Sequence, residues 1–289
     1  MNKIAIVVHG GAGPDSEFIK QNIEGYKKDL EEAVDAGYKV LEDGGSAVDA
    51  VEAAVNYLED NSLFNAGRGS ALNEKAEVEM GASIMDGKNL ESGAVAIVKN
   101  VKNPVTLARA IMERTKHTYL GAMGALEFAQ KIGLQLRPDA YFITDHAFEQ
   151  YTGAMENEAK SLQDAGEYQA KRKTHGTVGA VALDKEGNVA AATSTGGTEY
   201  KMPGRIADSS MVGIGSYANN KTCAVSSTGD GEYLMQNVIA FHISAIMEYK
   251  GFRLKEACHY LMNEKLKDVE GDMGIIAMDT QGNIAMEYN

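Results

Sequence analysis

The stretch that decides the fold is residues 175–195, His-Gly-Thr-Val-Gly-Ala-Val-Ala-Leu-Asp-Lys-Glu-Gly-Asn-Val-Ala-Ala-Ala-Thr-Ser-Thr. It contains an apolar run at 178–183 and a second strand-like run at 189–195, which is apolar at first and ends in Thr-Ser-Thr, and a polar connection that includes glycine joins them. Short apolar runs bounded by turn residues are typical of buried strands, and such a connection closes a hairpin. The sequence therefore predicts a buried β-hairpin in the second half of the chain.

The segment before this hairpin has a different character. Residues 151–176 lack Ile, Val and Phe and are rich in Glu, Lys, Gln and Ala. A segment of this composition buries little apolar surface, so we expect an exposed linker that includes some helix. The linker ends abruptly at Gly176-Thr177. A polar segment that runs directly into a buried strand is the form expected of a proenzyme cleaved at that junction.

Strand and helix patterns continue on both sides of the hairpin. Their order predicts a mixed α/β architecture, built from two halves, in which sheets lie between helices. Further strands are predicted at 4–8, 79–85, 94–99, 211–217, 222–227, 275–278 and 284–288, and helices at 23–41, 46–58, 103–112, 121–132, 232–249 and 254–266.

Composition excludes several classes of protein. The 289 residues include 28 Lys and Arg against 41 Asp and Glu, a net charge of −13, and nucleic-acid binding requires a basic face. Every apolar run is shorter than the ~20 residues that cross a bilayer, and the run at 4–8 is too short for a signal peptide. Cys223 and Cys258 show no metal-ligand spacing. We therefore expect a cytoplasmic protein with reduced thiols that binds neither nucleic acid nor membranes.

Glycine is abundant, with 31 residues where average usage predicts roughly 20, so we expect sharp turns and close backbone approaches. One such place is residues 10–13, Gly-Gly-Ala-Gly, whose N–H groups could hold an anion as nucleotide-binding loops do. This Gly10 turn lacks the GxGxxG spacing and the Walker ending. A structural turn is therefore the favoured interpretation, and a small-anion or nucleotide-binding protein is the alternative.

Thr177 is a candidate nucleophile. Cleavage after Gly176 would give Thr177 a free α-amino group, with an ordinary pKa near 8, that can act as base for its own hydroxyl. Judged by spacing alone, the simpler interpretation is a β-branched residue that begins a strand. The six histidines show no zinc-binding spacing, and the chain has no Gly-x-Ser-x-Gly motif, so we expect neither a metalloenzyme nor an α/β-hydrolase triad.

Two later segments gather hydroxyls and glycines, namely 193–208 and 226–232. The first also contains Arg205 and Asp208. Such a pair is usually a surface ion pair of little energetic value. Beside hydroxyls and bare backbone, however, the guanidinium could bind an α-carboxylate in a forked geometry while the carboxylate binds an α-ammonium group. These segments therefore favour a site for a small amino-acid substrate.

Together these segments resemble the plant-type L-asparaginases, also called isoaspartyl peptidases or β-aspartyl-peptidases, which are N-terminal nucleophile hydrolases. The resemblance runs from residue 4 to the end of the chain. It rests on six ordered motifs: His9-Gly10-Gly11-Ala12-Gly13, Leu63-Phe64-Asn65-Ala66-Gly67-x-Gly69, His175-Gly176-Thr177-Val178-Gly179-Ala180-Val181, Thr195-Gly196-Gly197, Pro203-Gly204-Arg205-x-x-Asp208 and Ser227-Thr228-Gly229-x-Gly231-Glu232.

The resemblance implies a four-layer αββα sandwich, with residues 1–289 as a single catalytic domain. The precursor would cleave itself between Gly176 and Thr177 into an α chain, 1–176, and a β chain, 177–289. Two such αβ units would form a homodimer.

The resemblance also implies roles for single residues. Thr177 would be the nucleophile, Thr195 and Asn65 would orient it, and Thr228 with the Gly229 N–H would form the oxyanion hole. The substrate carboxylate would bind Arg205, and its amino group would bind Asp208 and backbone at Gly229 and Gly231. No cofactor is implied for catalysis. A structural sodium ion would be held by backbone carbonyls of Leu58, Glu59, Asn61, Phe64, Ala66 and Arg68.

The reaction implied is hydrolysis of β-aspartyl dipeptides and L-asparagine through an acyl-enzyme on Thr177. Two alternatives stay open at this point. One is a processing-defective relative that persists as an uncleaved precursor, and the other is the anion-binding protein that would use the Gly10 turn.

Overall fold

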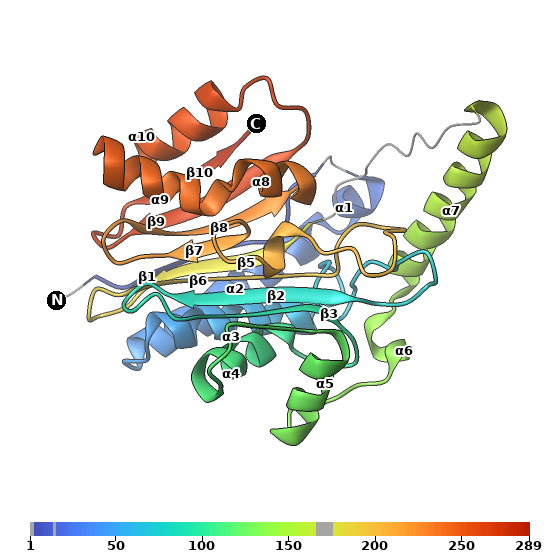
Figure 1. The fold of residues 1–289 in the computed structure, drawn as a ribbon, viewed down its shortest axis with the longest axis horizontal. Coiled ribbons are helices and arrows are strands. Elements are labelled where there is room, and N and C mark those ends of the chain that lie inside the picture. The colour runs from blue at the N-terminus through green and yellow to red at the C-terminus, as the bar shows by residue number, and fades with distance from the viewer. Residues whose placement is uncertain (1–2, 14–15, 166–175) are drawn as a thin grey trace.

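The computed structural model describes residues 3–13, 16–165 and 176–289, and Figure 1 shows their arrangement. The strands form two sheets. The six-stranded sheet has the order β1 (Ala5–His9), β5 (Val178–Leu183), β6 (Val189–Thr195), β2 (Met80–Asp86), β3 (Ser92–Val98) and β4 (Tyr119–Gly121). The four-stranded sheet has the order β10 (Ile284–Tyr288), β9 (Met273–Asp279), β8 (Cys223–Gly229) and β7 (Ser216–Ala218).

The predicted hairpin is β5–β6, and every residue of both strands is buried. β1 pairs antiparallel with β5 and places His9 opposite Gly179. This register sets Thr177, the residue before β5, beside the glycine turn that follows β1. The hairpin prediction is confirmed, and its first residue lies where the motifs of the first strand end.

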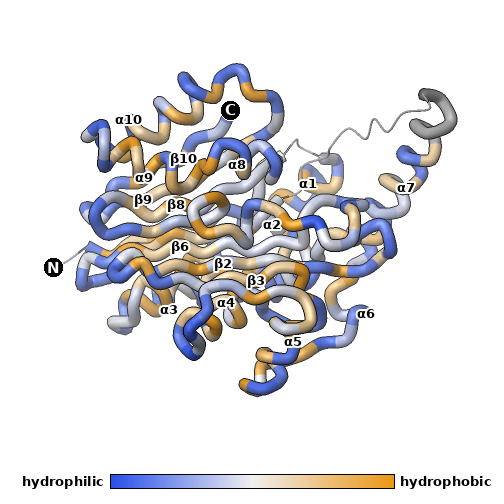
Figure 2. The backbone as a smooth tube through the Cα atoms, viewed as in Figure 1, coloured by the Kyte–Doolittle hydropathy of each residue, from blue (hydrophilic) through white to orange (hydrophobic). Residues whose placement is uncertain are grey.

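Three hydrophobic clusters join the elements. The largest packs one face of the six-stranded sheet against α2 (Ile23–Glu42), α3 (Ala47–Asp60) and α4 (Pro104–Arg114). A second lies between the sheets and includes Val181 and Met278. A third joins the four-stranded sheet to α9 (Ile239–Lys250) and α10 (Leu254–His259). Figure 2 shows apolar residues concentrated along the strands. The predicted mixed α/β class is thus confirmed.

Local signals correctly place several helices. Ser46 and Asp49 form the capping box of α3, with the Ser46 hydroxyl accepting from the Asp49 N–H at 3.2 Å. Pro104 occupies the first turn of α4, where a missing N–H costs no hydrogen bond. The remaining helices are α1 (Glu17–Gln21), α5 (Ala122–Lys131), α6 (Asp139–Phe142), α7 (Asp145–Ala165) and α8 (Gly231–Asn237), with a 3-10 turn at Asp208–Ser210 and a π-helical turn at Tyr260–Lys265.

The strand predicted over 211–217 is largely wrong, because only Ser216–Ala218 form β7. Before it, the Met211 N–H donates to the Asp208 carbonyl, and the Gly213 N–H donates to the Ser216 carbonyl, both at 2.7 Å. These backbone groups are therefore satisfied by local turns and not by a neighbouring strand.

The single helix predicted over 232–249 is broken. Val238, with φ of +49°, separates α8 from α9. The N–H groups of Ala240 and Phe241 donate to the Ile214 and Gly213 carbonyls, at 3.3 and 2.8 Å. Tertiary hydrogen bonds thus replace helical ones at the break, and no local sequence signal reveals this.

The predicted linker, 151–176, is helical over its first part, where it continues α7. Residues 166–175 lie outside the described part of the chain. Within the described ranges, 3–13, 16–165 and 176–289, no helix is both long and apolar enough to cross a membrane.

Candidate active site

The sequence motifs meet at one end of the two sheets. The ends of β1, β6 and β8 lie around the start of β5, and the 3-10 turn at Asp208–Ser210 covers the same place. Antiparallel pairing produces this convergence, because it brings the end of one strand beside the start of the next.

Thr177 is buried at the centre of this end, with 3% of its surface exposed. Its N–H donates to the Thr228 hydroxyl at 3.3 Å, and its own hydroxyl lies 3.1 Å from that of Ser209. The structure therefore brings Thr177 and Thr228 together as predicted. Sequence reasoning missed Ser209, and its only signal was its place directly after Asp208.

The Gly10 turn packs against the predicted cleavage junction. A Cβ atom added to Gly11, whose φ is +130°, would lie 2.3 Å from the Gly176 Cα. A Cβ atom on Gly176 would lie 2.7 Å from the Gly10 carbonyl oxygen. Only glycines permit this approach. The backbone of Gly176 occupies the space against the turn, which argues against the anion-binding alternative.

His9 is a buried residue near the Thr177 backbone. Its Nε2 atom is 2.7 Å from the Ser226 hydroxyl, and its Nδ1 atom is buried without a hydrogen-bond partner among the described residues. Burial lowers the pKa of His9 to about 4, and the nearby Thr177 backbone opposes part of this shift. The ring is therefore neutral at pH 7. Its role in the site was not predicted.

Arg205, Asp208 and Gly231 form the charged side of the site. A Cβ atom on Gly231 would lie 2.9 Å from both Arg205 Nη2 and Asp208 Oδ1. Arg205 donates two hydrogen bonds to the Glu232 carboxylate, from Nε to Oε1 at 3.1 Å and from Nη2 to Oε2 at 2.8 Å. Burial raises the pKa of Asp208 to about 7, although the Arg205 charge lowers it. The two predicted binding groups are thus neighbours, and Glu232, which ends one of the quoted motifs, is the partner of Arg205, a pairing that was not predicted.

Thr195 and Asn65 brace the turn after β6. The Thr195 hydroxyl accepts from the Gly197 N–H at 3.0 Å, and the Asn65 amide donates to the Gly197 carbonyl at 2.6 Å. The Asn65 side-chain oxygen accepts from the Ala71 N–H at 2.7 Å. The hydrogen bonds of both side chains therefore fix the turn at Gly197, which lies beside the site. The two residues would orient Thr177 indirectly, through this turn.

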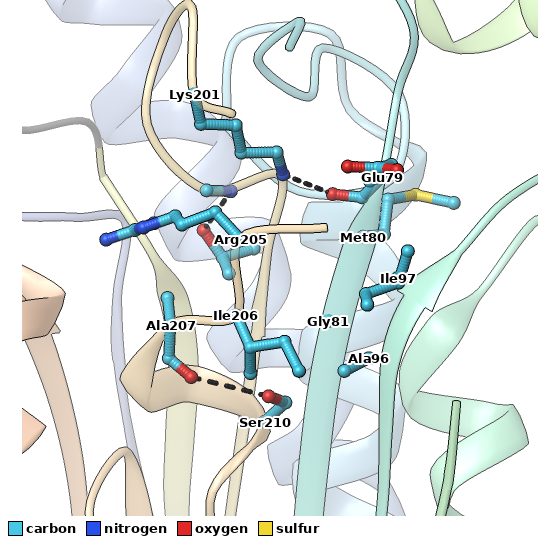
Figure 3. Close-up of a pocket in the computed structure, with 12 residues that line it drawn as sticks. Glu79, Met80, Gly81, Ala96, Ile97, Lys201, Arg205, Ile206, Ala207 and Ser210 are labelled. Carbon is cyan, nitrogen blue, oxygen red and sulfur yellow. Dashed lines mark hydrogen bonds between the residues drawn. The ribbon is translucent and has the colours of Figure 1, made fainter. Parts of the chain in front are cut away.

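A buried lysine fastens the same turn to the six-stranded sheet (Figure 3). Lys201 Nζ donates to the carbonyls of Glu79 and Gly196, both at 2.5 Å. Burial, together with the neighbouring Arg205 charge, lowers the pKa of Lys201 to about 7. Lys201 lines a pocket with Thr195 and Arg205, and sequence reasoning missed it.

The loop predicted to bind a sodium ion follows the end of α3 and folds back on it. The Arg68 N–H donates to the Glu59 carbonyl at 2.7 Å, and a Cβ on Gly69 would lie 2.7 Å from the Phe64 carbonyl oxygen. Burial raises the pKa of the Glu59 side chain to about 8. Among the residues whose placement is described, no cluster of three or more His, Cys, Asp and Glu side chains could hold a metal ion.

The site as a whole combines a buried threonine hydroxyl and its hydroxyl neighbours with a guanidinium and a carboxyl. Such groups supply a nucleophile, donors for a developing oxyanion and charges that complement an amino acid. A site with these groups is suited to hydrolysis of an amide through a covalent intermediate.

Comparison with known proteins identifies the family. The profile of the family described as Asparaginase matches residues 2–289, so the chain belongs to the asparaginase family, as the resemblance predicted. The "Isoaspartyl peptidase" of Escherichia coli K12 is 43% identical over 292 residues, which cover 100% of this chain and 91% of that protein. The human "Isoaspartyl peptidase/L-asparaginase" is 42% identical over 287 residues, covering 98% and 89%.

Proposed function

We propose that this chain is an autoprocessing N-terminal threonine amidohydrolase that hydrolyses β-aspartyl dipeptides and L-asparagine. The observation that carries the proposal is the buried Thr177, whose backbone N–H and hydroxyl contact Thr228 and Ser209 directly after Gly176. The names of the bacterial and human relatives support the same substrate class.

Maturation would cut the peptide bond between Gly176 and Thr177. It would convert a single catalytic domain, 1–289, into an α chain of residues 1–176 and a β chain of residues 177–289. The new α-amino group of Thr177 would then serve as base for the Thr177 hydroxyl. The packing of the Gly10 turn against Gly176 supports this junction, because it fixes the backbone on one side of the bond.

In the mature enzyme, the Thr177 oxygen would attack the side-chain carbonyl of the substrate. The Thr228 hydroxyl and the Gly229 N–H would stabilise the resulting oxyanion. Loss of ammonia or an amino acid would leave an aspartyl ester on Thr177, which water would hydrolyse to aspartate. Thr195 and Asn65 would orient the reacting groups through the turn that they hold.

Arg205 would bind the substrate α-carboxylate, and Asp208 would bind the α-ammonium group with backbone at Gly229 and Gly231. Their proximity in the structure supports this division of roles. The substrate carboxylate would bind the Arg205 guanidinium either beside the Glu232 carboxylate or in its place. An ammonium group beside Asp208 would favour its ionised form.

The proposal extends to the assembly. The layers of helices and sheets in Figure 1 would form the αββα sandwich of the N-terminal nucleophile hydrolases. Two αβ units would associate as a homodimer in the cytoplasm, without a catalytic cofactor. The uncharged carbonyls of Leu58, Glu59, Asn61, Phe64, Ala66 and Arg68 are chemically suited to sodium, which would stabilise the loop that carries Asn65.

The mass of the purified protein tests the proposal. The wild-type chain is expected to split into two pieces with Thr177 as a new N-terminus, while Thr177→Ala stays whole and inactive on β-aspartyl dipeptides. Thr222→Ala is a matched control, because it also removes a buried hydroxyl, bonded to Ser244 at 2.6 Å, but at a different place. The proposal is wrong if the wild type stays whole or if Thr177→Ala keeps activity.

A further inference from the structure

We propose that Ser209 carries the hydroxyl proton of Thr177 to Asp208 when the precursor cleaves itself. This inference rests on the proposed function. It addresses a step that the mature mechanism does not cover, because before cleavage the Thr177 nitrogen is a peptide N–H and has no basic lone pair. The precursor therefore needs another base.

The three side chains form a continuous path. The Thr177 hydroxyl lies 3.1 Å from the Ser209 hydroxyl, which donates to Asp208 Oδ2 at 3.4 Å. All three residues are at least 97% buried, so bulk water has little access to the path. The path is thus a route along which the proton can leave Thr177.

Ser209 is held in place by its backbone. Its carbonyl accepts from the hydroxyls of Ser83 and Thr193, each at 2.7 Å. Those two residues lie on β2 and β6, within the six-stranded sheet. The sheet thereby fixes the 3-10 turn that presents the Ser209 hydroxyl to Thr177.

The other neighbours of Thr177 are less suited to accept this proton. Thr228 accepts from the Thr177 N–H through its own hydroxyl oxygen. The Nε2 atom of His9 is already paired with the Ser226 hydroxyl, and no hydrogen bond among the described residues joins His9 to the Thr177 hydroxyl. Ser209 is the described partner of the Thr177 hydroxyl itself, and it leads to a carboxyl group.

The proposed self-cleavage uses only groups of the chain and one water molecule. The Thr177 proton passes to the Ser209 oxygen while the Ser209 proton passes to the Asp208 carboxylate. The Thr177 oxygen bonds to the Gly176 carbonyl carbon, and the C–N bond breaks as one proton returns from Asp208 to the nitrogen. The ester formed is an isomer of the peptide. Water then hydrolyses it to the Gly176 carboxylate and free Thr177.

The charge around Asp208 predicts a pH dependence. Arg205 faces it with a positive charge and lowers its pKa, whereas Glu232 on α8 raises it. Burial is the largest influence and raises the pKa to about 7. Because the relay needs the carboxylate, the rate of self-cleavage should rise as pH increases through about 7.

The test measures self-cleavage of freshly synthesised full-length chains by intact mass over time. Ser209→Ala and Asp208→Asn should each cleave roughly 100-fold more slowly than wild type, because a positioned general base contributes on that order. Ser209→Thr keeps the hydroxyl and should recover most of the rate. Ser244→Ala, a buried hydroxyl away from the site, is the matched control and should cleave like wild type.

The outcomes separate this inference from the function on which it rests. If the wild-type chain never cleaves itself, the proposed function is wrong. A wild type that cleaves while Ser209→Ala keeps its rate and pH profile overturns the relay alone. The relay is also overturned if His9→Gln blocks cleavage and Asp208→Asn does not, since His9 would then be the base. Thermal unfolding of each variant shows whether a slow rate reflects loss of the fold.

Discussion

The space between the two sheets has two ends of different chemistry, although the same strands line both. At one end the residues between the sheets are apolar, and they include Met85, Val181, Val189, Ala224 and Met278. At the other end, hydroxyls meet across the gap: Ser83 on β2 lies 2.8 Å from Ser216 on β7, and Thr177 contacts Thr228.

The period of a strand explains this division. Side chains two residues apart share a face. Along β6, Val189 and Ala191 belong to the apolar cluster, whereas Thr193 and Thr195 lie further toward the site. The apolar end holds the sheets together, and the hydroxyl end uses that rigid spacing to position Thr177. Stability and chemistry are therefore separated along the same strands.

Gly179→Ala should have the largest effect, because Gly179 lies at the hydroxyl end between the sheets. Its added Cβ would lie 2.0 Å from the Ser226 hydroxyl and 2.5 Å from His9 Nε2. We expect destabilisation at or above the upper end of the roughly 1–3 kcal/mol typical of overpacking, together with loss of self-cleavage. Chemical denaturation and intact mass measure the two effects.

Gly124→Ala is the matched control, because nothing lies within 4 Å of the added atom in α5. It should stabilise the protein by up to about 0.5–1 kcal/mol, because alanine in a helix loses less conformational freedom on folding than glycine does. If Gly179→Ala matched this gain and still cleaved, the close packing of the hydroxyl end would have no functional meaning.

Arg205→Ala should have the next largest effect, on activity. Removing the fork that would bind the α-carboxylate is expected to raise KM and lower kcat/KM roughly 100-fold, equivalent to about 2.7 kcal/mol. Steady-state kinetics on β-aspartyl dipeptides measure this. Arg253→Ala, which removes an exposed arginine before α10, should leave the kinetics unchanged. Unchanged kinetics in Arg205→Ala would contradict its assignment.

Lys201→Met should have a smaller effect on activity, because Lys201 positions the turn and contacts no reacting group. We expect KM to rise roughly tenfold, or about 1.4 kcal/mol, with little change in kcat. Lys185→Met, which also removes a bond to a carbonyl, that of Glu42, but at the surface, should change neither. A fall in kcat with KM unchanged would contradict this positioning role.

The pKa of Lys201 adds a second readout. Burial lowers it from 10.5 to about 7, so the unfolded chain binds this proton more tightly than the folded protein does. The contribution of Lys201 to the free energy of unfolding should therefore increase between pH 7 and 10.5. Lys201→Met should lose that increase in denaturation experiments over this range.

The smallest effect is expected at the apolar end. Ile276→Val should cost about 1 kcal/mol of stability and leave self-cleavage unchanged. Thr193→Val, of nearly equal shape, removes a hydroxyl that donates to the Ser209 carbonyl at 2.7 Å and should slow self-cleavage. If the two variants changed self-cleavage equally, the apolar end and the hydroxyl end would not differ in their importance for self-cleavage.

Much of the fold was predictable because its signals are local. The alternation of apolar runs and turn residues predicted β5–β6, and the Ser46 capping box predicted α3. The failures occurred where tertiary contacts override local preference. The strand expected over 211–217 became turns, and the helix expected over 232–249 broke at Val238 to bond with Gly213 and Ile214.

The site was predictable in a similar, partial way. Motifs indicated Thr177, Thr228, Arg205 and Asp208, and the structure places them together. Ser209 and Lys201 were missed, and His9 and Glu232 stood in the quoted motifs without an assigned role, because the function of such a side chain depends on which groups lie beside it. Their signals are hydrogen bonds between residues far apart in the chain.

The sequence by itself determined the strand periods, the glycine positions and the polar segment before Thr177, since these depend on the chemistry of neighbouring residues. Only the tertiary structure decided which hydroxyls meet Thr177 and which backbone packs against Gly176. Strand pairing and the stacking of the sheets set those distances, and both depend on contacts between segments separated by more than a hundred residues.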